Sequence, residues 1–167
     1  MNDRDKLILR TACDFVTERE IPGNQGWEDP KFEALMKKTG WKTGEAWCAY
    51  FIEAVLITAG LEDHAKVISG SAVETWNNCI RSPLFEIHST PQIGDIIIWQ
   101  NYKDGSSQWS GHAGYVVGMG KGMLATAEGN TDSEGGMEGI EVAIKIRNPL
   151  DKPQNGLRVL GFLGINN

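Results

Sequence analysis

The apolar residues of this chain change their spacing half-way along it, and this change most restricts the possible fold. In the first half they recur with a helical period, as in Ile8, Ala12, Phe15 and Val16, which fall at i, i+4, i+7 and i+8. In the second half they form short β-branched or aromatic runs between clusters of Gly, Pro, Asn and Ser. Helices followed by strands predict an α+β fold, with helices packed on a mostly antiparallel sheet.

The individual elements follow from these patterns and from the turn residues between them. Asp29 and Pro30 form a typical helix start, and Gly40 and Gly60 are natural helix stops. We expect helices at 3–19, 30–38, 46–59 and 71–78, and strands at 95–99, 111–117, 123–127, 141–147 and 158–165. The segment 46–59 is apolar on nearly every face, which predicts a helix buried in the middle of the domain.

Two further expectations concern the sheet and its loops. In 141–147 charged and apolar residues alternate, so we expect one face of the sheet to be solvated and the other to be covered. The segments 100–110 and 132–139 are polar or glycine-rich, which predicts mobile surface loops. With 167 residues and no repeat or linker, the chain is expected to form one domain, 1–167.

Charge and cysteine content exclude several classes of function. Sixteen Lys and Arg against 22 Asp and Glu give a net charge of −6, which disfavours nucleic acid as a partner. The three cysteines show no CxxC pair, so neither a disulfide framework nor a thiolate zinc site is indicated. The polar start differs from a secretory signal, and no apolar run reaches membrane-spanning length. We expect a monomer without membrane insertion, made in the cytoplasm.

Cys48 is the first candidate for catalysis, because it falls in the first turn of the predicted buried helix. There the free N–H groups and the positive end of the helix dipole favour a thiolate. The same N–H groups can stabilise the oxyanion of a tetrahedral intermediate, which is what acyl transfer requires. The alternative is that Cys48 only packs in the core, as most cysteines in apolar helices do.

His112 is the candidate general base for Cys48. It stands at the start of a predicted strand and is flanked by small residues that leave space around the imidazole. The alternative is a histidine that only bonds to a backbone carbonyl. His64 and His88 lie in polar contexts and are predicted to be surface residues.

Glu128 and Asn130 follow another predicted strand. They are two residues apart, so in a continuing strand they share a face and can both approach one imidazole. Either side chain could fix the tautomer and orientation of His112. The alternative is that Glu-Gly-Asn-Thr is only a turn that ends the strand.

Together these segments resemble the CHAP domain, the cysteine, histidine-dependent amidohydrolase/peptidase. The resemblance rests on Trp-Cys-Ala-x-Phe at 47–51, Gly-Asp-Ile-Ile-Ile-Trp at 94–99, Gly-His-Ala-Gly-Tyr-Val-Val at 111–117 and Glu-Gly-Asn at 128–130. The segments 19–23 and 41–47 further resemble a compact, phage-associated branch of such proteins.

The resemblance implies a papain-like fold and hydrolysis of an amide bond in bacterial peptidoglycan. It implies Cys48 as nucleophile, His112 as general base, Glu128 as the residue that orients the imidazole, and Asn130 as a fourth polar member. Some relatives bind calcium through an acidic loop before the cysteine, but here 41–47 contains only one acid, so no metal and no other cofactor is expected.

Trp47 and Trp109 are the candidates for substrate binding, because they lie nearest these motifs in sequence. The alternative is that both are core or rim residues.

The expected function is a peptidoglycan hydrolase, either a stem-peptide endopeptidase or an N-acetylmuramoyl-L-alanine amidase. A phage or prophage lysin that acts on the wall after release or delivery is the expected setting. The alternatives are a non-catalytic module that binds wall or partner, and a toxin-like effector with the same chemistry. A zinc amidase is disfavoured, since the three histidines show no ligand spacing.

Overall fold

The computed structural model describes residues 3–131 and 139–166. Within these residues the chain forms helices first and strands afterwards, as an α+β fold. The helices are α1 (Asp3–Asp14), α2 (Pro30–Lys38), α3 (Cys48–Thr58), α4 (Glu62–Ala65) and α5 (Ala72–Cys79). The strands are β1 (Phe85–His88), β2 (Ile96–Lys103), β3 (Ser106–Gly120), β4 (Met123–Thr131), β5 (Glu141–Arg147) and β6 (Gly156–Ile165).

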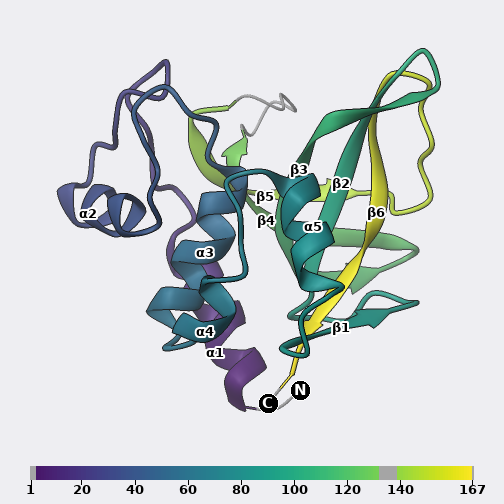
Figure 1. The fold of residues 1–167 in the computed structure, drawn as a ribbon, viewed down its shortest axis with the longest axis horizontal. Coiled ribbons are helices and arrows are strands. Elements are labelled where there is room, and N and C mark those ends of the chain that lie inside the picture. Colours follow the sequence, from purple (N-terminus) through teal and green to yellow (C-terminus); the bar gives the residue numbers. More distant parts are fainter. Residues whose placement is uncertain (1–2, 132–138, 167) are drawn as a thin grey trace.

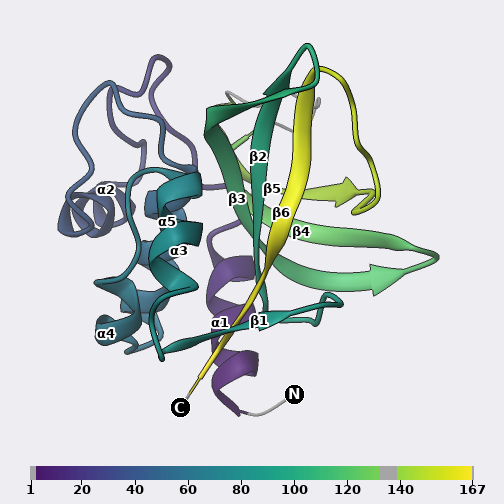
Figure 2. The ribbon, with the colours of Figure 1, turned by 45° about the vertical axis from the view of Figure 1, so that its right-hand side comes forward.

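The strands form one antiparallel sheet with the order β1-β6-β2-β3-β4-β5. Figure 1 shows the helices gathered on one side of this sheet, and in Figure 2 the pair β4–β5 curves away from the other strands. The predicted α+β fold with a mostly antiparallel sheet is therefore confirmed. None of the helices in 3–131 and 139–166 is long and apolar enough to cross a membrane.

The helices match the sequence patterns, with three differences. α1 ends at Asp14 rather than near residue 19, because Thr17 adopts a left-handed conformation (φ 85°) that a helix cannot continue through. α2 begins as predicted, with the Asp29 carboxylate accepting the Lys31 N–H at 2.7 Å. α3 starts at Cys48, two residues later than predicted, and the short helix α4 was not predicted.

α3 is the centre of the core, as its uniformly apolar sequence predicts. Seven of its eleven residues are buried, and it packs on β3, β4, α1, α2 and α4. The buried phenol of Tyr115 on β3 donates a hydrogen bond to the Ile52 carbonyl at 2.9 Å. Helix and sheet are thus joined by a directional contact as well as by apolar packing.

The predicted loop at 100–110 is wrong, because β2 and β3 continue through it as a hairpin. Asp104 (φ 50°) and Gly105 (φ 78°) make the tight turn, since both adopt the left-handed conformation that such hairpins require. The Gln100 amide donates to the Gln108 carbonyl at 2.8 Å across the pair. β1 is a further strand that was not predicted, and 132–138, the larger part of the other predicted loop, lie outside the described residues.

The alternation in β5 is real, but its orientation is the reverse of the prediction. Ile144 and Ile146 are 42% and 65% exposed, whereas Lys145 is buried and Arg147 is half-buried. The curved strands enclose a second, smaller apolar cluster on the face away from the main core, formed by Ile97, Trp99, Val116, Leu124 and Phe162. The charged side of β5 therefore faces an interior rather than solvent.

Candidate active site

Cys48 is the first residue of α3 and lines a cleft of about 950 Å³. The preceding residue, Trp47, takes the N-cap position, and no side chain in the described part of the chain caps this helix. The first N–H to find an intrahelical acceptor is that of Phe51, which bonds to the Trp47 carbonyl at 2.9 Å. The N–H groups of the first turn are therefore available beside the Cys48 sulfur, as the sequence predicted.

His112 lies on β3, where it is almost fully buried and lines the same cleft. It interacts with Cys48, which lines the same cleft, and its Nε2 lies 2.8 Å from Oε2 of Glu128. Burial alone would lower the pKa of His112, but the hydrogen bonds and negative charges of Cys48 and Glu128 outweigh it and raise this pKa to about 9. The imidazolium form is therefore favoured at neutral pH.

Glu128 is a fully buried carboxylate with three partners. Besides His112, it accepts the Thr126 hydroxyl at 2.5 Å and Nε of Arg147 at 2.8 Å, both on Oε1, and Nη2 of Arg147 on Oε2. Burial raises the pKa of this carboxyl, but the hydrogen bonds from Arg147 and His112 and their positive charges lower it to about 2. Glu128 is thus ionised across the neutral range.

Asn130 lies in the cleft wall rather than against the imidazole. β4 is irregular between Glu128 and Thr131, and Asn130 adopts the left-handed conformation (φ 54°), which asparagine tolerates better than most residues. The expected two-residue alternation therefore fails here. Of the two predicted partners, the structure brings Glu128 to His112, whereas Asn130 is buried and lines the cleft.

Gly129 explains how β4 reaches the start of α3. A Cβ atom at this position would lie 2.6 Å from Phe51 Cβ and 2.7 Å from Trp47 Cζ3, which is closer than side chains tolerate. The missing side chain therefore lets the strand pack directly on the first turn of the helix. This contact holds Glu128 and His112 at the level of Cys48.

The comparison with known protein families agrees with this geometry. The CHAP domain model matches residues 38–130, which is more than half of the chain. The chain belongs to the CHAP family. Its papain-like arrangement is the one seen in the structure, with a helix that begins at a cysteine packed on an antiparallel sheet that carries the histidine. Comparison with curated proteins and with solved structures gave no match.

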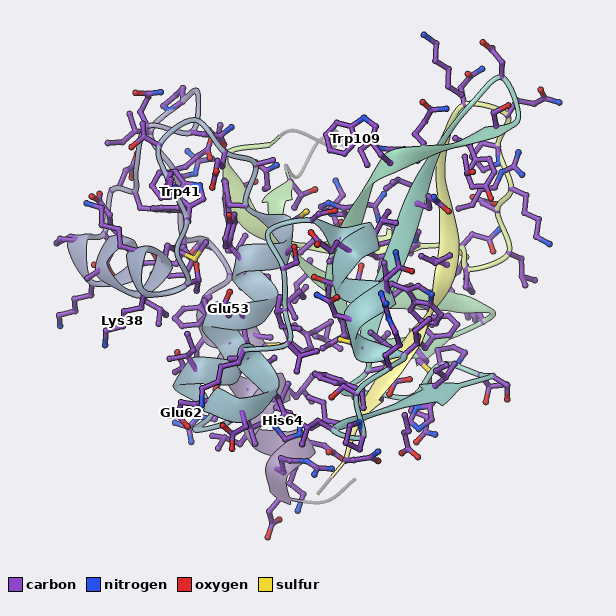
Figure 3. All side chains as sticks on the ribbon, viewed as in Figure 1. Lys38, Trp41, Glu53, Glu62, His64 and Trp109 are labelled. Carbon is purple, nitrogen blue, oxygen red and sulfur yellow. The ribbon has the colours of Figure 1, made fainter. Side chains whose placement is uncertain are left out.

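Trp47 was predicted to line the cleft of this CHAP domain, and this prediction is wrong. Its side chain is 0% exposed and packs edge-on against Trp27 and Phe32, while its indole N–H donates to the buried carboxylate of Glu20. Trp109 does line the cleft and is 84% exposed. Figure 3 shows Trp109 standing clear of the ribbon at the upper end of β3.

The other histidines and cysteines lie away from the CHAP site. His64 is buried rather than on the surface, because its ring packs on Phe85 and its Nε2 lies 3.1 Å from the Asn166 carbonyl oxygen. Cys79 is buried, and burial raises the pKa of its thiol to about 12. Cys13 is exposed, and all three cysteines are free.

His88 is only partly exposed and lies between two carboxylates. Its Nδ1 is 2.9 Å from Oδ1 of Asp95, and its Nε2 is 2.9 Å from Oε1 of Glu86. The prediction of a surface residue therefore holds only in part. Among the described residues, no group of three or more His, Cys, Asp or Glu side chains could hold a metal ion.

Sequence reasoning missed two residues that contact the catalytic candidates, Thr126 and Arg147, and it gave Trp99 of the 94–99 motif no role beside His112. Trp99 is paired with His112 across β2 and β3, and its ring centroid lies 5.7 Å from that of the imidazole at an angle of 31°. Thr126 could have been found from its position two residues before Glu128. Arg147 gives no local signal, because only the register of β5 on β4 brings it to the site.

Proposed function

We propose that this CHAP protein is a cysteine peptidoglycan hydrolase, with Cys48 as nucleophile and His112 as general base. The family as a whole is one of amidohydrolases and peptidases linked to peptidoglycan. The observation that carries the proposal is the placement of Cys48 and His112 in one cleft, with His112 bonded to the ionised Glu128, at the uncapped start of α3. A buried imidazolium next to a cysteine favours the thiolate that amide cleavage needs.

The proposed reaction has two halves. The Cys48 thiolate attacks the carbonyl carbon of the scissile amide, and the N–H groups of the first turn of α3 stabilise the resulting oxyanion. The C–N bond then breaks as the His112 imidazolium gives its proton to the leaving amine, which leaves a thioester on Cys48. Water then attacks the thioester carbon as His112 takes its proton, and the C–S bond breaks, which releases the acid and restores the Cys48 thiolate and the His112 imidazolium.

The remaining residues support this reaction in stated roles. Glu128 holds the imidazole by its Nε2 and stabilises its positive charge. Asn130 is proposed as the fourth polar member of the site, and Trp109 offers an exposed aromatic face for the substrate. We propose a stem-peptide endopeptidase or an N-acetylmuramoyl-L-alanine amidase, and a phage or prophage lysin as its setting, made in the cytoplasm and delivered to the wall.

Turnover of purified peptidoglycan tests the proposal. We expect wild type and Cys13→Ala, which changes an exposed thiol outside the cleft, to release new amino groups at equal rates. Cys48→Ala and His112→Ala should release none above the background. Mass spectrometry of the products separates the two candidate bonds, since a freed stem peptide and a cut peptide differ in mass. Equal release by wild type and Cys48→Ala would reject the proposal and favour a binding module.

A further inference from the structure

Arg147 is outside the segment that matches the CHAP family, yet it contacts the site by two routes. Its guanidinium binds both oxygens of the fully buried Glu128, and its side chain is itself only 21% exposed. The same guanidinium lies over the ring of Trp99, 5.5 Å from its centroid, and that ring lies beside His112. Two contacts of different kinds therefore link one arginine to the catalytic imidazole.

The contact on Oε2 has a direct electrostatic consequence. Oε2 is the oxygen that also binds Nε2 of His112, so guanidinium and imidazolium share one carboxylate oxygen. The fixed charge of Arg147 keeps Glu128 ionised although it is buried, and it opposes a second positive charge on the imidazole. Of the other ionisable groups nearby, Cys48 from α3 interacts with the same imidazole, and Lys145 is paired with Thr126 across β4 and β5.

We propose that Arg147 is a positioning residue of this CHAP site, which fixes the Glu128 carboxylate against His112 and sets the upper pH limit of the imidazolium form. The inference rests on the proposed function for its activity readout. A fork of two parallel hydrogen bonds gives the geometry, and the positive charge gives the pH limit. Substitution of Arg147 by lysine or by glutamine separates these two contributions, because lysine keeps the positive charge but loses the pair of parallel hydrogen bonds.

The test is the pH dependence of kcat/KM for wild type, Arg147→Lys and Arg147→Gln. In Arg147→Gln the guanidinium is removed, so the alkaline limb, where kcat/KM falls with rising pH, should lie about one pH unit higher. This shift corresponds to an about tenfold higher proton affinity of His112. Arg147→Lys should keep the wild-type limb at a lower maximum. Arg158→Gln is the matched control, because that guanidinium also lies over a ring, 3.9 Å from the centroid of Tyr102, away from the cleft.

The rate of Cys48 alkylation against pH gives the same information without turnover. If wild type does not cleave peptidoglycan, the proposed function fails, and the alkylation profile still tests Arg147. An alkaline limb of Arg147→Gln that coincides with that of wild type would overturn the inference. So would a uniform loss of rate in Arg147→Gln at every pH, since a merely structural role predicts that result for the variant without the charge.

A second, independent observation concerns the charge of the cleft. Among the described residues that line it, no lysine or arginine is present, and Glu45 is the one carboxylate. Its Oε2 accepts hydrogen bonds from the Tyr50 hydroxyl at 2.8 Å and the Lys42 N–H at 3.2 Å. Its backbone carbonyl accepts the Trp41 indole N–H at 2.8 Å. The chain thus holds a carboxylate in place three residues before the nucleophile.

We infer that Glu45 forms a subsite for a substrate ammonium group next to the scissile amide. A fixed carboxylate in a cleft without lysine or arginine attracts a positive group and repels the carboxylates that stem peptides also carry. Peptide amino groups of the wall supply that chemistry, so the cleaved segment would carry a free amine. This inference deepens the proposed function and rests on it.

Soluble muropeptides, used before and after N-acetylation of their amino groups, test this subsite. For wild type, acetylation should raise KM about three- to fivefold with little change in kcat, the size expected of a solvent-exposed ion pair. Glu45→Gln should have the raised KM on both substrates. Glu62→Gln, an equal charge change on α4 outside the cleft, should behave as wild type.

The outcomes distinguish failure of the ammonium subsite from failure of the proposed hydrolase activity. Equal wild-type KM on both substrates would reject the ammonium subsite while the hydrolase stands. Acetylation sensitivity retained in Glu45→Gln would reject it as well. Absence of turnover on either substrate would reject the hydrolase itself.

Discussion

Glu128→Gln should destabilise the protein by an amount that depends on pH in a bell-shaped way. The folded pKa of Glu128 lies below its ordinary value of 4.5, at about 2, so its contribution is present above pH 4.5 and is lost as the pH falls toward 2. The folded pKa of His112 lies above its ordinary value of 6.5, at about 9. Its contribution is therefore present below pH 6.5 and is lost as the pH rises through 9.

The magnitude follows from the same values. A carboxyl whose pKa falls from 4.5 to about 2 on folding contributes about 3 kcal/mol once it is ionised, since each pH unit corresponds to about 1.4 kcal/mol. The pKa shift of His112 arises first from Cys48 and only in part from Glu128, and that part is already contained in the shift of Glu128, so the two contributions are not added. Glutamine keeps the shape of the side chain and removes the charge, so the loss relative to wild type should reach this size between pH 4.5 and 6.5.

Urea unfolding followed by tryptophan fluorescence gives the measurement, because the chain has six tryptophans. The free energy of unfolding of wild type minus that of Glu128→Gln should be largest between pH 4.5 and 6.5 and should shrink on both sides. Glu62→Gln on α4 should show a small difference at every pH. A wild-type advantage over Glu128→Gln that stays constant across the pH range would refute the reasoning.

Three further predictions concern the cleft and its support. At neutral pH iodoacetamide should label Cys48 before Cys13. Cys13 is exposed, but partial burial of its thiol and the charge of Asp14 raise its pKa. Slower labelling of Cys48 than of Cys13 in a time course would favour a non-catalytic module. Gly129→Ala should lower the free energy of unfolding by about 1–3 kcal/mol through overpacking and should reduce turnover. Gly120→Ala is the control, because a Cβ atom at this position meets open space, and it should match wild type within error in the same urea assay. Trp109→Ala should raise KM at unchanged stability; an unchanged KM would remove Trp109 from the substrate groove.

The nucleophile helix and the order of the site residues could be predicted because they depend on local patterns. The run of apolar residues at 46–59 marks a buried helix whatever surrounds it, and Cys48 at its start follows directly. Glu128 could be predicted for a similar reason, since it directly follows the predicted strand 123–127 and precedes Gly129. The fold class followed from the same change of hydrophobic period.

The remaining features depend on long-range pairing, which local patterns do not determine. Arg147 reaches Glu128 only because β5 pairs with β4 in one register and the sheet curves around a second apolar cluster. This curvature also reverses which side of β5 is exposed. Trp47 was misassigned because an aromatic residue beside a nucleophile can face either the cleft or the core, and buried Glu20 binds its indole N–H.

The hairpin at 100–110 was taken for a loop because its residues are polar. In the structure, side-chain amides replace apolar contacts across the pair, as where the Asn101 amide donates to the Ser110 hydroxyl at 2.9 Å. A strand pattern based on alternating hydrophobic residues therefore does not predict this polar part of the β2–β3 pair.

The most direct test of the central claim is to trap the acyl-enzyme. Protein quenched in acid during peptidoglycan turnover should carry a thioester-linked adduct, and mass spectrometry of its peptides should place that adduct on Cys48. The mass of the acyl group would also identify the bond that is cut. The account predicts this adduct in wild type and its absence in Cys48→Ala, together with loss of turnover. Turnover that continues in Cys48→Ala without any adduct would contradict it.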